Sequence, residues 1–273
     1  MAAASKVVLI TGASSGIGQA TAQLLAQQGF TIFGTSRNPS SMERIPNIEV
    51  LPLDVRLDKS AKTCVETLLK RAGRLDILIN NAGYELGGAI EEAALEEVKA
   101  QFETNFFGAV RMVRTVLPIM RRQGSGQIIN ISSLAGLTPP PFMGFYSATK
   151  FALEGYTEVL RHEVKHFNIK VSLVEPPYIR TNLWQTRQYP VDRISDYDPW
   201  RHRASKATQK HQGKAPEPGL VAECILHIIE TKSPRLRYVV GKRAAVVFRL
   251  RRFLPESQYE KAVRRLFQLD VKK

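Results

Sequence analysis

The sequence predicts an α/β fold in which one doubly wound parallel sheet, flanked by helices, spans residues 1–273 as a single domain. Short apolar runs of strand length alternate with stretches of helical periodicity. Turn-forming or polar residues follow most of these runs, which is typical of strands that end in a turn. Such alternation produces β-α-β units, and hence a parallel sheet with right-handed crossovers.

The first half of the chain contains four of the apolar runs. The first, Lys6–Ile10, precedes a helical pattern that Gly29 stops, and the second ends at Ser36 before a polar turn. The third ends at Asp54-Val55, and the fourth is closed by Asn80-Asn81-Ala82-Gly83. We therefore expect strands at 6–10, 30–36, 48–53 and 75–79, and helices at 19–28 and 59–71.

The second half continues the alternation with longer helices. One run ends in Ser132-Ser133, and the next ends in Glu175-Pro176-Pro177. We expect strands at 127–131, 169–174 and 237–240, and helices at 102–122, 146–167 and 218–230.

A glycine-rich turn, Thr11-Gly12-Ala13-Ser14-Ser15-Gly16-Ile17-Gly18, joins the first strand to the first helix. Strand, glycine turn and helix together are typical of dinucleotide binding, because glycines let the backbone approach a pyrophosphate at the helix N-terminus. The spacing differs from G-x-G-x-x-G, and an ordinary strand-to-helix connection has the same local pattern. The turn alone therefore leaves both interpretations open.

The carboxyl ends of several strands carry polar or glycine residues, and ligands of such sheets bind beyond these ends. Gly12, Arg37, Asp54 and Asn81 all fall there. Where a carboxylate would hold an adenosine ribose hydroxyl, the chain has Arg37, whose guanidinium suits a 2′-phosphate. The sequence therefore favours NADP(H) over NAD(H), the alternative being that Arg37 is a solvated loop charge.

Tyr146 and Lys150 are four residues apart on a predicted helix and so share one face. An ammonium group close to a phenol lowers the pKa of the phenol and turns it into a usable general acid/base. A lone Tyr-x-x-x-Lys is common in structural helices. Its position after the glycine turn, Asn80-Asn81-Ala82-Gly83 and Ser133 favours the catalytic interpretation.

At this point the sequence resembles the short-chain dehydrogenase/reductase (SDR) family, strongly over residues 5–181. The resemblance is carried by Thr11-Gly12-x-x-x-Gly16-x-Gly18, Asn80-Asn81-Ala82-Gly83, Asn105, Ser133 and Tyr146-x-x-x-Lys150, in the family's order. It is most similar to the 17β-hydroxysteroid and retinol dehydrogenase subgroup. The resemblance implies a Rossmann-type fold and interconversion of a ketone or aldehyde with an alcohol by hydride transfer.

The resemblance also implies site residues. Tyr146 would be the general acid/base, Ser133 would hydrogen-bond the substrate oxygen, Asn105 would hold a relay water, and Lys150 would lower the Tyr146 pKa and bind the nicotinamide ribose. The implied cofactor-binding residues are Gly12, Ser14, Ser15, Gly16, Ile17, Gly18, Arg37, Asp54, Val55, Asn81, Ala82, Gly83, Tyr146, Lys150, Pro176, Ile179 and Thr181. One departure is Pro177, where the family usually has glycine, which stiffens the loop. No metal is expected, because His162-Glu163-Val164-Lys165-His166 has no evident third ligand.

Charge is distributed unevenly along the chain, whose net charge is +14. Residues 234–273 contain twelve Lys/Arg against three Asp/Glu, so +9 of the total lies in this segment. Two cysteines make no disulfide framework, and residues 2–5 do not predict a secretory signal, so we expect a cytoplasmic protein. No recognition motif for nucleic acid accompanies the basic charge.

Two C-terminal segments are assigned separately. Residues 182–216 are poorly periodic, and the family resemblance implies that they form an irregular substrate lid. An apolar substrate face, suited to a steroid-, retinoid- or fatty-chain-like substrate, is suggested by the aromatic residues of this segment together with three residues of an earlier loop: Trp184, Tyr189, Tyr197, Trp200, Pro140, Phe142 and Met143. The alternative is that these aromatic residues only anchor the loop. The basic extension 242–273 is amphipathic over 243–254. It suits packing on the pocket or on a neighbouring subunit, and peripheral membrane contact is a less favoured alternative.

The sequence thus predicts an NADP(H)-dependent oxidoreductase of an apolar carbonyl or alcohol substrate, assembled as a homodimer or homotetramer. Two alternatives stay open. One is a reductase of ketones bound to an acyl carrier, which the basic C-terminus would dock. The other is a catalytically idle NADP(H)-binding regulator.

Overall fold

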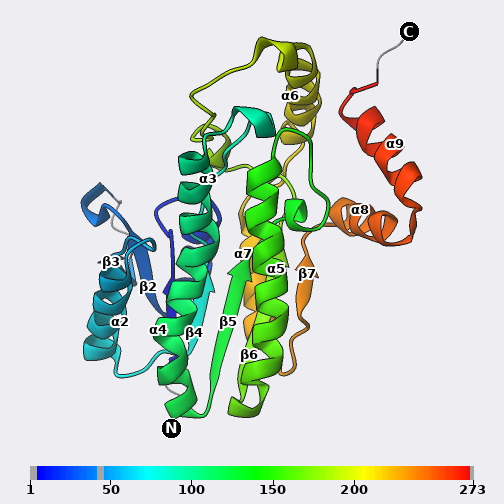
Figure 1. Ribbon diagram of the computed structural model, residues 1–273. Coiled ribbons are helices and arrows are strands. Elements are labelled where there is room, and N and C mark those ends of the chain that lie inside the picture. Colours follow the sequence, from blue (N-terminus) through cyan, green and yellow to red (C-terminus); the bar gives the residue numbers. More distant parts are fainter. Residues whose placement is uncertain (1–4, 42–45, 271–273) are drawn as a thin grey trace.

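The computed structural model describes residues 5–41 and 46–270 and shows a parallel sheet with helices on both faces (Figure 1). The strand order is β3-β2-β1-β4-β5-β6-β7, and every neighbouring pair is parallel. The predicted α/β sheet is thereby confirmed. The strands are β1 (Val7–Ile10), β2 (Thr31–Ser36), β3 (Ile48–Pro52), β4 (Ile77–Asn80), β5 (Gly126–Ile131), β6 (Ile169–Glu175) and β7 (Arg237–Val239).

The order of the strands reverses between β1 and β4. The chain runs outward from β1 to β3 and then crosses back, so that β4 pairs with the other side of β1 through Leu9 and Leu78. The helices that follow these two strands leave on opposite faces of the sheet. A crevice therefore opens at the carboxyl ends of β1 and β4, which is where ligands of such sheets bind.

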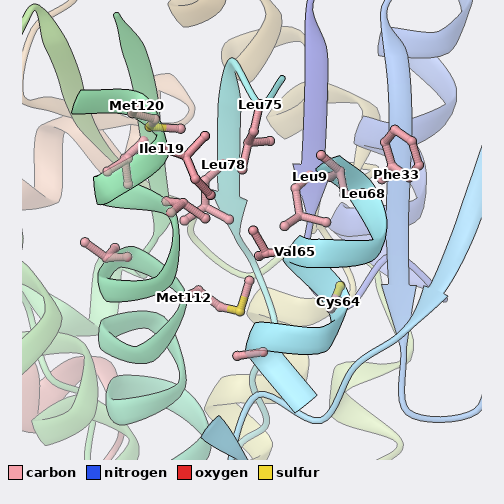
Figure 2. Packing of buried hydrophobic residues seen from close by; sticks show 14 of the residues in the cluster. Leu9, Phe33, Cys64, Val65, Leu68, Leu75, Leu78, Met112, Ile119 and Met120 are labelled. Carbon is pink, nitrogen blue, oxygen red and sulfur yellow. The ribbon is translucent and has the colours of Figure 1, made fainter. Parts of the chain in front are cut away.

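Two apolar layers hold the helices against the sheet. On one face, α1 (Gly16–Gln27) and α7 (Gly219–Glu230) cover Val8, Ile10 and Ile79. The other face is covered by α2 (Asp58–Ala72), α4 (Gly108–Gln123) and α5 (Gly144–Val164). Figure 2 shows this second layer, in which α2 and α4 pack their apolar faces over the strands. These layers fix the strand ends that carry the site.

The helix predicted at 102–122 is longer and is interrupted. Helix α3 (Leu95–Phe102) comes first, a five-residue π turn (Glu103–Phe107) follows, and α4 continues from Gly108. π turns are frequent at functional sites because the extra residue redirects a side chain. Here the turn contains Asn105, which is buried.

The expectation that residues 182–216 are irregular is wrong for their second half. Helix α6 (Asp198–Gln212) occupies it, preceded by short 3₁₀ turns at Asn182–Trp184 and Ser195–Tyr197. Only Ala204 and Ala207 of α6 are buried, so the helix lacks the apolar stripe that would have revealed it.

Beyond β7 the chain forms two further helices, α8 (Lys242–Phe253) and α9 (Glu256–Leu266). They lie beyond the carboxyl ends of the strands, near α6, and extend away from the sheet (Figure 1). Within the described residues, no helix combines the length and the apolar character needed to cross a bilayer.

Candidate active site

A continuous cavity of about 1410 Å³ opens at the carboxyl ends of the strands. Two of the predicted site residues lie outside it: Gly18 packs behind its wall, and Asn105 lines a separate small pocket. The others all line it, namely Gly12, Ser14, Ser15, Gly16, Ile17, Arg37, Asp54, Val55, Asn81, Ala82, Gly83, Ser133, Tyr146, Lys150, Pro176, Ile179 and Thr181.

The three glycines of the first turn are required for two reasons, backbone conformation and lack of space. Gly12 and Gly16 have φ of +66° and +56°, a region that favours glycine. A Cβ on Gly18 would lie 2.3 Å from the Gly12 carbonyl oxygen and 2.5 Å from Asn81 Nδ2. The turn is thus closed too tightly for any side chain at Gly18.

The neighbouring strand end holds this turn in place. Asn81 Nδ2 donates to the carbonyl oxygens of Thr11 (3.0 Å) and Gly12 (2.9 Å). In return, Thr11 Oγ1 accepts from the backbone N–H groups of Asn81 (2.9 Å) and Ala82 (3.0 Å). The Asn81 side chain therefore braces the glycine turn, while its residue also lines the cavity.

The residues at this end of the cavity fit a dinucleotide. Helix α1 begins at Gly16 facing the cavity, and its first turn contains no acidic residue. Ser15, at the N-cap, makes no capping hydrogen bond with its side chain. The unpaired N–H groups of a helix N-terminus attract a pyrophosphate, and no carboxylate competes for them here.

Arg37 lies at the end of β2 with its side chain exposed at the cavity edge. Asp54, which lines the same cavity, forms an ion pair of 2.6 Å with Arg56, another residue of the lining. This pairing, with a smaller contribution from Arg37, holds the Asp54 pKa below its usual value. Among the described residues, this part of the cavity lining thus includes the guanidinium groups of Arg37 and Arg56 and the carboxylate of Asp54.

The three residues that the sequence predicts for proton transfer meet in the cavity. Tyr146 is buried, and its hydroxyl hydrogen-bonds that of Ser133 at the end of β5. Ser133 is fixed in turn, because its Oγ accepts from the Ala135 N–H at 3.1 Å. Lys150 Nζ donates to the Ile131 carbonyl oxygen at 2.9 Å and lies 5.7 Å from the centroid of the Tyr146 ring.

In this structure the pKa of Tyr146 is raised, and not lowered towards neutrality as the sequence argument expected. Burial raises the pKa of Tyr146, and the carboxylate of Glu85 raises it further, while the Ser133 hydroxyl opposes them. Burial also lowers the pKa of Lys150 to about 8. The sequence argument considered only the attraction between the two side chains and omitted the cost of removing both from water. Tyr146 is consequently protonated at neutral pH.

Asn105 lies behind Lys150, held by the π turn. Its Oδ1 accepts from the Tyr84 N–H (3.0 Å), and its Nδ2 donates to the Tyr84 carbonyl oxygen (2.9 Å) and to Thr149 Oγ1 (3.3 Å). Asn105, Lys150 and Thr11 line a pocket of about 10 Å³. That volume is close to the size needed for one water molecule, and the lining supplies polar partners.

The sequence analysis missed a buried ion pair beside Tyr146. Arg187 donates twice to Glu85 Oε2, at 2.8 and 2.6 Å, and both side chains are largely buried. Burial nevertheless raises the pKa of Glu85. The two residues lie 102 positions apart, so no local pattern could have paired them.

The segment 182–216 is held by two further acidic side chains, Glu92 before α3 and Glu97 in its first turn. Glu92 accepts from the Ile194 N–H (2.9 Å) and pairs with Arg201, and Glu97 accepts from the Val191 N–H (3.2 Å). Of the aromatic and apolar residues expected at the substrate face, Pro140, Met143 and Trp184 line the cavity, whereas Phe142, Tyr189, Tyr197 and Trp200 do not.

Helices α8 and α9 supply the remaining wall, so the basic segment packs on the pocket, one of the alternatives that the sequence left open. Their contribution is mostly apolar and comprises Val247, Leu250, Leu254, Tyr259, Ala262, Val263, Leu266 and Phe267. Phe267 is anchored against Ala204 and Ala207 of α6. The lining of the cavity thus combines polar groups around Tyr146 with apolar residues of and next to α8 and α9.

Comparison with known proteins decides the family. The profile of the short chain dehydrogenases matches residues 6–191. The chain belongs to the short-chain dehydrogenase family. It is therefore an NAD(P)-dependent oxidoreductase that acts on a carbonyl or alcohol group.

Three relatives illustrate the similarity. A 3-ketodihydrosphingosine reductase of Bacteroides thetaiotaomicron is 42% identical over 262 residues, which cover 95% of this chain and 97% of the relative. The structure of a short-chain dehydrogenase from Streptomyces avermitilis superposes with a TM-score of 0.80 at 33% identity, over 97% of this chain and 99% of that one. The structure of ElxO with NADP bound has a TM-score of 0.74 at 28% identity, over 86% and 97% of the two chains.

Proposed function

We propose that this short-chain dehydrogenase is an NADP(H)-dependent reductase of a ketone carried on a long alkyl chain. The single observation behind the proposal is the set of residues that line the cavity. Its polar end contains Tyr146, Ser133 and Lys150, and its other end is walled by the apolar residues of α8 and α9. A ketone next to a long chain matches both ends. The related bacterial enzyme, a 3-ketodihydrosphingosine reductase, acts on a substrate of this class.

In this proposal the chain's own residues position the carbonyl and move a proton. The Ser133 hydroxyl binds the ketone oxygen, and the Tyr146 hydroxyl donates its proton to that oxygen. Lys150 then stabilises the tyrosinate, and the water-sized pocket at Asn105 and Lys150 connects the site to a source of new protons. The bound nicotinamide supplies the hydride, so the protein's part is orientation and proton transfer.

Two features support reduction and NADP(H). Because burial keeps the Tyr146 pKa raised, its hydroxyl is protonated and ready to donate at neutral pH. We assign the 2′-phosphate of the cofactor to Arg37, with Arg56 nearby, because guanidinium groups bind phosphate. ElxO, a structural relative, has been solved with NADP bound. The glycine turn, Asn81–Gly83 and Thr181 complete the proposed cofactor site.

The cofactor assignment is tested by titrating wild type and Arg37→Ser with NADPH and with NADH, following nicotinamide fluorescence. A charge-assisted hydrogen bond contributes about 1.5–3 kcal/mol, so the NADPH dissociation constant should rise about 10- to 100-fold while that of NADH is unchanged. Arg122→Ser, on an exposed residue at the far end of α4, is the matched control. Equal losses for both cofactors would contradict the assignment.

The substrate assignment is tested by NADPH oxidation with a series of 3-ketones of increasing chain length, including 3-ketodihydrosphingosine. Each buried methylene contributes about 0.8 kcal/mol, so kcat/KM should rise at least about 100-fold between 6 and 16 carbons. Steroid, retinoid and acyl-carrier-bound carbonyls are the competing substrates. A flat dependence on chain length would overturn the proposal, and so would full activity of Tyr146→Phe.

Two further assignments accompany the function. We propose a homo-oligomer formed through α4 and α5, because Phe107, next to α4, and Phe151 and Val159 on α5 are exposed apolar residues. Light scattering on the purified chain tests it. We also propose a cytoplasmic location, which Cys64 and Cys224, both free thiols, support.

A further inference from the structure

Helices α8 and α9 form a two-helix unit that packs little against the rest of the protein. Ala244 is the one buried residue among the two helices. The unit contacts the rest of the protein through its residues that line the cavity and through Phe267, which packs on α6. Most of its outer surface is therefore unpartnered within the described chain. Figure 1 shows the two helices extending from the carboxyl-end side of the sheet.

The outer face of α8 presents an apolar stripe. Val246, Leu250 and Phe253 follow the i, i+4, i+7 spacing of one helix face and are 53%, 49% and 79% exposed. An exposed stripe of this kind on a helix indicates a surface that meets an apolar partner. Leu250 also lines the cavity, so the stripe continues into the cavity wall.

Basic residues surround the stripe. Residues 242–266 contain eight Lys/Arg and two Glu, which gives this unit a net charge of +6. Lys242 and Arg249 flank the stripe by helical position, and Arg252 lies further round the helix. A second copy of the chain meeting this face through a two-fold axis would bring two such charges together, which is unfavourable. The complementary surface is apolar and negatively charged.

We propose that α8 and α9 dock on the surface of an anionic lipid bilayer, with Val246, Leu250 and Phe253 inserted at the boundary between headgroups and acyl chains. An amphipathic helix with basic residues beside an apolar stripe binds such a boundary. Because Leu250 belongs both to the stripe and to the cavity wall, the docked protein opens its apolar cavity end toward the lipid phase. A long-chain substrate then passes from the bilayer into the cavity without crossing water.

The docking surface is independent of the proposed substrate, and its assay requires no turnover. Full-length protein is mixed with vesicles of phosphatidylcholine alone or with phosphatidylglycerol added, at about 0.1 M salt, and the bound fraction is measured by flotation. We expect at least about tenfold tighter binding to the anionic vesicles, since each basic residue near the surface adds to the attraction. High salt should weaken this binding.

Two variants outside the cavity lining separate charge from insertion. The double variant Arg249→Glu/Arg252→Glu should lose at least about tenfold in vesicle affinity, and Phe253→Ser should lose affinity that salt does not modulate. Reduction of a short, water-soluble ketone should be unchanged in both, which shows that they fold. Lys59→Glu/Lys62→Glu, two exposed lysines on α2, is the control with the same change of charge and should bind as wild type.

Three results would overturn the proposal. One is wild-type protein that does not bind anionic vesicles, and another is binding that the α8 variants leave unchanged. The third is that the α8 variants keep their vesicle binding and change only the oligomeric state, or lose only the binding to an acidic acyl-carrier protein. Either result would assign the surface to a protein partner. Failure here leaves the chain-length series for the proposed function unaffected.

Discussion

Glu175, the last residue of β6, is a fully buried acid next to Pro176, which lines the cavity. Its replacement tests whether this carboxyl group is protonated in the folded protein. The side chain is 0% exposed, and neither carboxylate oxygen has a hydrogen-bond partner among the described residues. Arg237 Nε lies 3.9 Å away but already binds Glu154 at 3.1 Å. Burial, reinforced by Glu154, raises the pKa of Glu175 to about 8.

The raised pKa predicts a loss of stability with rising pH. An unfolded glutamate has a pKa of about 4.3, so between pH 5 and 7 the folded protein binds one more proton than the unfolded chain. The free energy of unfolding then falls by about 1.4 kcal/mol per pH unit, or roughly 2.5 kcal/mol over this interval. Glu175→Gln removes this dependence, because glutamine does not titrate.

The measurement is urea unfolding of wild type and Glu175→Gln at pH 5, 6 and 7 and at one protein concentration. The stability of the variant relative to wild type should improve by roughly 2.5 kcal/mol from pH 5 to 7. Glu158→Gln is the matched control, because Arg237 lowers the pKa of this half-exposed residue; Glu158 is therefore ionised in both states between pH 5 and 7, and its removal should give no measurable trend over this interval. A pH-independent difference for Glu175→Gln would show that Glu175 is ionised in the folded protein and would refute the reasoning.

Two further changes test the site. Gly18→Ala should destabilise the protein by about 1–3 kcal/mol and weaken NADPH binding, because the new methyl group displaces the Asn81 amide; urea unfolding and fluorescence titration measure both. Gly155→Ala, in α5 with open space around it, should instead be neutral or stabilising by about 0.5–1 kcal/mol, and equal effects of the two would contradict the clash. Glu85→Gln should move the alkaline limb of the reductase pH profile to lower pH, because Glu85 raises the pKa of both Tyr146 and Lys150; an unchanged profile would remove Glu85 from the electrostatics of the site.

The sheet could be predicted from the sequence because each strand is an apolar run of the right length with a turn-forming or polar end. The predicted strand at 75–79 is Ile77–Asn80 in the structure, and that at 169–174 is Ile169–Glu175. Local spacing also sufficed for the residues around Tyr146, since parallel strands bring their carboxyl ends to one edge. The assignments that depend only on backbone topology were therefore the accurate ones.

Features that depend on contacts between distant segments could not be predicted. Helix α6 carries few apolar residues and is held by contacts of Ala204 and Ala207 with Phe267, about 60 positions later. The Glu85–Arg187 ion pair likewise joins two segments that lie far apart in the sequence. The pKa of Tyr146 was predicted in the wrong direction for a related reason, because burial is a property of the assembled cavity and not of the Tyr-x-x-x-Lys spacing.

The two ends of the cavity explain why the chemistry is easier to predict than the substrate. Most of the residues predicted for the chemistry and for cofactor binding lie after strand ends or in the N-terminal halves of α1 and α5. The apolar part of the lining, from α8, α9 and the segment 182–216, needs only apolar side chains of suitable volume. Many different apolar residues meet that need, so no fixed sequence pattern marks it. A sequence pattern therefore identifies the family and its class of reaction, whereas the substrate must be argued from the volume and lining of the assembled cavity.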